Sequence, residues 1–262
     1  MRITSILIPF IVLIVGVAGF MMRMIELASA FDPVTGLPER DALITTILIG
    51  FSIIVFLVAI IFAISTTVRF KVSNDYDNAF GTDSFAYPAI YTAIGTIWLV
   101  ATIVYFLELY SLGDIESLFQ IFAIASSLSA ISLIIFAIEV YKNPRRKFLS
   151  LLSIIPTLFM CYWLILIYRD NASNPVLLSY AYMCLAIVFS SIGLYFSSGF
   201  AIGKTVIGKA IVGYIGATYF CMVTLADDIS MSLKLIIGAI AFMNLFNLSS
   251  LIRNLQRKIK TS

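Results

Sequence analysis

Eight long apolar runs constrain this chain more than any other feature of its sequence. Each run has about 20 residues or more, which is the length that an α-helix needs to cross roughly 30 Å of hydrocarbon. Because lipid offers no hydrogen-bond partner to backbone groups, runs of this length cross a bilayer as helices. The alternating pattern of a membrane β-barrel is absent. The expected spans cover residues 4–24, 43–66, 89–110, 117–141, 148–168, 176–200, 206–226 and 233–252.

The composition supports the same class of protein. Hydrophobic residues make up 61% of the 262 residues and charged residues only 12%, against about 45–50% and about 25% in soluble domains. We therefore expect an all-α, polytopic integral membrane bundle of about eight helices that forms a single transmembrane domain over residues 1–262. The lipid bilayer is its first expected partner, and we expect no nucleic-acid partner.

The positions of lysine and arginine predict the orientation of the spans. On the side of the chain termini lie 13 of the 17 basic residues, while the other side carries 10 of the 14 acidic residues. By the positive-inside rule, both termini should be cytoplasmic and the spans should lie in the cell membrane. The basic loops, above all residues 142–147, are expected to contact anionic lipids. The 13 basic residues are Arg2, Arg69, Lys71, Lys142, Arg145, Arg146, Lys147, Lys204, Lys209, Arg253, Arg257, Lys258 and Lys260.

The N-terminus allows a second topology. Its apolar run precedes Ala28-Ser29-Ala30, which has the form of a signal-peptidase site. Against cleavage, the run is longer than a usual signal-peptide core, and Arg23 and Glu26 lie where a cleavage region is normally uncharged. We expect an uncleaved first span, with cleavage as the alternative.

The loop after the first span contains the most motif-like stretch in the chain. Residues 32–38 read DPVTGLP and resemble the start of GGDEF (diguanylate cyclase) domains. The chain enters an apolar span at Leu43, however, and no Gly-Gly-Asp/Glu-Glu-Phe turn occurs in the sequence. The likeness is therefore coincidental. The turn-forming residues predict an ordered hairpin loop, or alternatively a lid over an outward-facing site.

Several kinds of chemistry lack the residues that they need. The chain contains no histidine, and its three cysteines, at positions 161, 184 and 221, form no C-x-x-C pair. We find no nucleophile motif and no pair of acidic residues deep within a span. We therefore expect no catalytic residues, no metal, no cofactor and no enzymatic activity.

Polar residues within spans are costly in lipid, so they are the best indicators of function in such a chain. Five of them are expected at the outer membrane level and could line an outward-open pocket. The alternative is an interfacial belt of aromatic and charged side chains. The candidate ligand-binding residues are Glu26, Glu108, Arg169, Tyr180 and Tyr182.

Two asparagines lie deeper in the membrane. Asn244 and Asn247 are three residues apart in the last span, so they share a helix face. They could bond to a neighbouring helix or contribute to a site. The serine-rich span 117–141 is a candidate for the centre of the bundle, because small residues let helices approach closely.

The chain resembles multi-pass membrane proteins of anaerobic Gram-positive gut bacteria, which combine an FD-x-x-TGL loop with a YRD…NPVLLSYAY segment. This resemblance implies a bacterial source but no activity, so no functional residue is carried over from it. The sequence favours small-molecule binding or transport through an outward-facing pocket. The alternative is a membrane sensor, receptor or scaffold that acts through a partner protein, and a homo-oligomer or a membrane partner is compatible with either function.

Overall fold

The structure is a computed structural model of the whole chain. It describes residues 3–32, 37, 39, 42–72, 79–80, 85–111, 113, 116–142, 149–174, 176–204 and 206–257. Within this described part, eight helices are long and apolar enough to cross a membrane, so the expected all-α polytopic bundle is confirmed. They are α1 (Thr4–Ser29), α2 (Leu43–Arg69), α4 (Ala86–Ser111), α5 (Ser117–Lys142), α6 (Leu149–Asp170), α7 (Ala181–Ala201), α8 (Ile207–Thr224) and α9 (Met231–Asn254).

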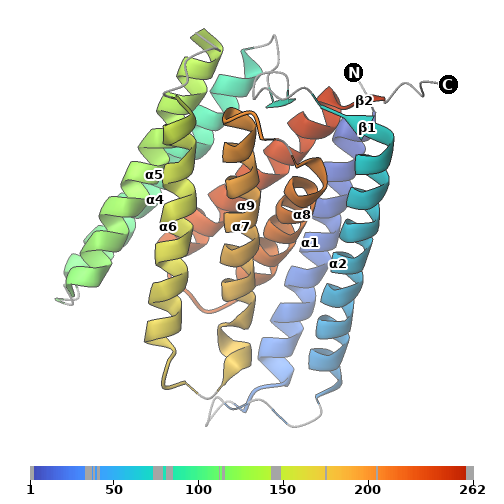
Figure 1. Cartoon of the computed structure of the whole chain (residues 1–262). Helices are drawn as coiled ribbons and strands as arrows, with labels where there is room; N and C mark the ends of the chain where they lie inside the picture. Colours follow the sequence, from blue (N-terminus) through green and yellow to red (C-terminus); the bar gives the residue numbers. More distant parts are fainter. Residues whose placement is uncertain are drawn as a thin grey trace.

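Both chain termini lie at the same end of the bundle, which we call the terminal end; the opposite end is the distal end (Figure 1). At the terminal end, strands β1 (Phe70–Lys71) and β2 (Gln256–Arg257) form a short antiparallel pair. Phe70 is opposite Arg257 in this pair. The pair therefore fastens the end of α2 to the segment that follows α9.

The centre of the bundle is formed by α8 and α9. In the most apolar part of each helix, 72% of the residues of α8 and 67% of those of α9 are buried, compared with 50% of those of α5. Helix α8 packs against α1, α2, α7 and α9. The expectation that the serine-rich span 117–141 is central is therefore wrong. Its Ser126 accepts a hydrogen bond from the Trp98 indole N–H at 2.9 Å, and so serves the packing of α5 on α4.

Glycines allow α8 to approach its neighbours. A Cβ atom added to Gly213 of α8 would lie 2.7 Å from the backbone nitrogen of Gly193 on α7. On the other side of α8, a Cβ at Gly19 of α1 would lie 2.8 Å from Tyr219 and from Val223. Helix α1 therefore packs closely against α8, and cleavage after Ala30 would remove these contacts.

The sixth span begins later than the sequence suggests. Residues 177–179 form a short 3-10 helix, η1 (Leu177–Ser179), and α7 starts only at Ala181. The cause is local, because Asn174 accepts a hydrogen bond from the backbone N–H of Val176 at 2.9 Å and donates one to Ser179 at 3.0 Å. This turn is held by side-chain hydrogen bonds that compete with the helix.

Candidate functional site

A buried charged cluster lies near the distal end, where α1, η1, α7 and the α8–α9 loop meet. The Arg23 guanidinium donates hydrogen bonds to Asp227 Oδ1 at 2.7 Å, to Glu26 Oε2 at 2.8 Å and to the carbonyl of Leu178 at 3.0 Å. Arg23 is only 1% exposed and Glu26 is fully buried. We call Arg23, Glu26, Tyr182 and Asp227 the charged cluster.

Local structure positions each member of the cluster. Arg23 and Glu26 are three residues apart on α1, so they share a helix face. Asp227 lies in a turn in which its own backbone N–H donates a hydrogen bond to the carbonyl of Thr224 at 3.0 Å. The Tyr182 ring, near the start of α7, faces the guanidinium with 4.9 Å between its centroid and Arg23 Cζ. This is a cation–π contact.

The hydrogen bonding of the cluster is incomplete. Glu26 Oε1 and the Tyr182 hydroxyl are buried and have no hydrogen-bond partner within the described part of the chain. Burial raises the pKa of the Asp227 carboxyl above its ordinary value, while the Arg23 charge acts in the opposite direction. When all are ionised, the cluster holds two carboxylates and one guanidinium.

The structure distributes the five candidate ligand residues over several places. Glu26 and Tyr182 meet in the charged cluster. Glu108 accepts a hydrogen bond from the Ser232 hydroxyl at 2.6 Å, and so joins α4 to α9. Arg169 pairs with Glu116 and with Asp170 on the exposed surface. Tyr180 is half-buried at the end of η1. The spacing of Arg23 and Glu26, three residues apart on one helix, is a local signal for their pair, whereas the part played by Asp227 had no local signal.

The two asparagines of α9 serve different contacts. Asn247 accepts a hydrogen bond from the Tyr91 hydroxyl, which joins α9 to α4. The Asn244 side-chain N–H group donates a hydrogen bond to the carbonyl of Ile240 at 2.9 Å, within α9. The Asn244 Oδ1 atom occupies the space that a side chain on Gly193 of α7 would need. Both side chains are buried between helices.

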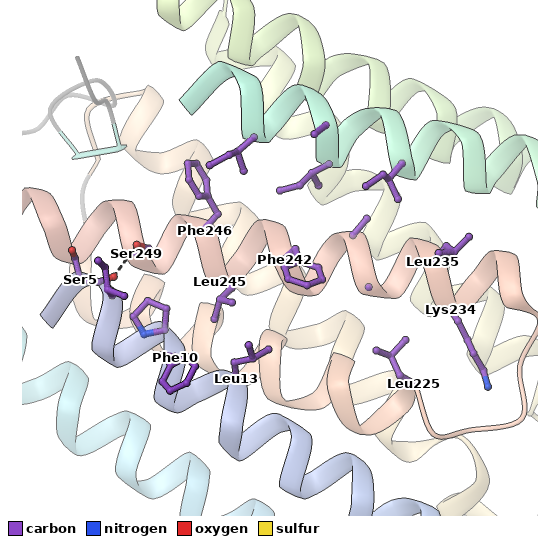
Figure 2. A pocket seen from close by; sticks show the side chains of 18 of the residues that line it. Ser5, Phe10, Leu13, Leu225, Lys234, Leu235, Phe242, Leu245, Phe246 and Ser249 are labelled. Atoms are coloured by element: carbon purple, nitrogen blue, oxygen red, sulfur yellow. Dashed lines mark hydrogen bonds between the residues drawn. The ribbon is translucent and has the colours of Figure 1, made fainter. Parts of the chain in front are cut away.

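A long apolar groove lies between α1, α4 and α9, with a volume of about 960 Å³ (Figure 2). Its walls are almost entirely hydrocarbon. None of the five candidate ligand residues lines it. Among the residues that line it are Phe10, Leu13, Ile94, Ile97, Leu235, Phe242, Leu245 and Phe246.

The groove differs at its two ends. Near the terminal end, the Ser249 hydroxyl donates a hydrogen bond to the carbonyl of Ser5 at 2.8 Å, which joins α9 to α1. Near the distal end lies Lys234, in the first turn of α9 (Figure 2). Between these ends, Gly238 has open space where a side chain would be, with no atom within 4 Å of an added Cβ.

A second, smaller cavity of about 360 Å³ lies between α1, α2 and α8, and its lining includes Phe51, Val55 and Ile215.

All three cysteines are free thiols. No group of three or more Cys, Asp or Glu side chains that could hold a metal occurs among the described residues. The expected lid loop falls largely on residues 33–36, 38 and 40–41, which lie outside the described part of the chain. The expected basic loop, residues 142–147, lies outside it from residue 143 onward.

Comparison with known proteins gave no relative. No protein-family model matches the chain, and neither a curated protein nor a solved structure matches it.

Proposed function

We propose that this protein binds a long-chain lipid with an anionic head group in the groove between α1, α4 and α9. The observation that carries the proposal is the groove itself, which is apolar along its length and has a lysine at one end. The function expected from the sequence was small-molecule binding or transport through an outward-facing pocket; the ligand proposed here is also a small molecule, but none of the five candidate ligand residues lines its groove.

The lining of the groove indicates the chemistry of the ligand. Ligand sites are usually concave and mostly apolar, with a few polar groups that fix orientation. From Lys234 to Ser249 the groove follows sixteen residues of α9, and the fifteen helical steps between the two residues correspond to about 22 Å along the helix. An extended hydrocarbon chain of about this length fits along the groove.

The charge at the distal end indicates the head group. Lys234 lines the groove and forms no ion pair with a described residue. A lysine ammonium at the end of such a groove can form a charge-assisted hydrogen bond with the phosphate of a lipid head group. A phosphate group placed there would pair with Lys234 while its chain lies along α9.

The orientation belongs to the same proposal. We propose that the protein lies in the cell membrane with both termini in the cytoplasm, so that Lys234 faces outward. The support is the excess of lysine and arginine on the terminal side. A green fluorescent protein fused after Ser262 should therefore fluoresce, while alkaline phosphatase at the same site should be inactive. Active phosphatase together with a dark fluorescent fusion would reverse the orientation.

Blocking the groove tests the ligand site. The Gly238→Leu variant should fold like the wild type, because no atom lies within 4 Å of the added Cβ, and its side chain should occupy the groove. We expect at least about a tenfold loss of affinity, which corresponds to about 1.4 kcal/mol. Native mass spectrometry of the purified protein, titrated with phosphatidic acid, measures the bound fraction.

The matched control is Gly50→Leu on α2, where an added Cβ also meets no atom within 4 Å. It should bind phosphatidic acid like the wild type.

The Lys234→Gln variant tests the head-group contact. It should bind phosphatidic acid more weakly than the wild type does. Its affinity for phosphatidylcholine that carries the same acyl chains should equal that of the wild type. Equal binding by the wild type and Gly238→Leu would contradict the proposal. A dimer without lipid would assign the groove to a second copy of the chain.

A further inference from the structure

The charged cluster has an excess of negative charge in a buried place. Glu26 and Asp227 carry two carboxylates against the single guanidinium of Arg23. A buried charge without a counter-charge is costly. With all groups ionised, the cluster therefore lacks one positive charge.

Among the described residues, Arg23 is the only group that forms an ion pair with Glu26 or Asp227. From α1 come Arg23 and Glu26, from α7 the Tyr182 ring, and from the α8–α9 loop Asp227. Tyr219 of α8 interacts with Tyr182 and is neutral at pH 7. Lys234 of α9 acts on Asp227 only at a distance, since no ion pair joins them.

Two polar atoms in the cluster are available for a ligand. Glu26 Oε1 is buried in a fully buried side chain, and the Tyr182 hydroxyl belongs to a side chain that is only 4% exposed. Neither has a hydrogen-bond partner among the described residues. Buried polar atoms normally have such partners, and because both oxygens belong to the charged cluster, one ligand could satisfy both of them.

The place on the helix also favours a cation. Glu26 lies in the last turn of α1, which ends at Ser29. The last turn of a helix carries partial negative charge, which favours a cation nearby.

We infer that the charged cluster binds one small monovalent cation, Na⁺, between Glu26 Oε1 and the Tyr182 hydroxyl. The cation supplies the missing positive charge and gives both oxygens a partner. The third carboxylate that a divalent metal site commonly uses is absent from the cluster, which agrees with the lack of a three-residue metal group in the described chain. This site is separate from the lipid groove, whose lining includes neither Glu26 nor Tyr182.

Thermal unfolding of the full chain in detergent tests the inference. At fixed pH and ionic strength, replacing choline chloride by NaCl should raise the unfolding midpoint and then saturate, because a ligand that binds only the folded state stabilises it. Glu26→Gln should remain folded, since one carboxylate then faces one guanidinium, and should lose the response to Na⁺. Asp228→Asn is the control: this neighbour of Asp227 is exposed, and its variant should respond like the wild type.

A second variant keeps the test decisive if Glu26→Gln does not fold. Tyr182→Phe removes the hydroxyl but keeps the ring against Arg23, and should raise the half-saturating Na⁺ concentration about tenfold, the equivalent of roughly one hydrogen bond. A wild-type midpoint that is the same in NaCl and in choline chloride would overturn the inference. So would an unchanged response to Na⁺ in either variant.

Discussion

Replacing Arg23 by methionine should lower the free energy of unfolding by about 3–5 kcal/mol, the usual cost of removing one partner from a buried ion pair. Arg23 is the common partner of Glu26 and Asp227, at 2.8 Å and 2.7 Å, and it also satisfies the carbonyl of Leu178. Without it, the carboxylates of Glu26 and Asp227 have no ion-pair partner among the described residues. Unfolding by sodium dodecyl sulfate in mixed micelles measures the change.

An exposed arginine provides the control for this prediction. Arg169 also forms two ion pairs, with Glu116 and Asp170, but these pairs are in contact with solvent. Exposed ion pairs contribute little to stability, so Arg169→Met should unfold close to the wild type. Adding Glu26→Gln and Asp227→Asn to Arg23→Met should restore part of the lost stability. An Arg23→Met variant as stable as Arg169→Met would show that the cluster does not hold the distal end together.

Gly213→Ala should lower the free energy of unfolding by about 1–3 kcal/mol or more, as overpacking of a tight core does. The added methyl would lie 2.7 Å from the Gly193 nitrogen and 2.8 Å from its Cα atom. These are backbone atoms, so a change of side-chain rotamer gives no relief, and α7 and α8 must move apart. The same detergent titration measures the loss.

The matched substitution is Gly50→Ala on α2, where the added methyl meets no atom within 4 Å. Because alanine is the better helix former by about 1 kcal/mol, this variant should be as stable as the wild type or more stable. If Gly213→Ala and Gly50→Ala were equally stable, α7 and α8 would not be in backbone contact.

The helices could be predicted from the sequence because a membrane span has a strong local signal. A run of about 20 apolar residues has few structural alternatives in lipid. The expected boundaries fail where side chains change the local structure, as Asn174 does when it holds the turn before α7. Such capping depends on geometry that a count of apolar residues does not contain.

The packing of the helices could not be predicted in the same way. These helices are apolar on nearly all sides, so no face is marked as the inner one. Arg23 and Glu26 are close in sequence and their pairing was foreseeable, whereas Asp227 is 204 residues from Arg23. The groove depends on how α1, α4 and α9 separate, and Gly238 leaves space there. The central position of α8 follows from its contacts with four other helices.

Photo-crosslinking of a lipid tests the central claim most directly. Phosphatidic acid with a diazirine in the middle of one acyl chain would be added to the purified protein, irradiated, and its attachment sites mapped by peptide mass spectrometry. We predict labels on groove residues such as Phe10, Leu13 and Phe242, and their loss in Gly238→Leu but not in Gly50→Leu. Labels spread equally over the lipid-facing side chains of α2, or unchanged in Gly238→Leu, would contradict a lipid site in the groove.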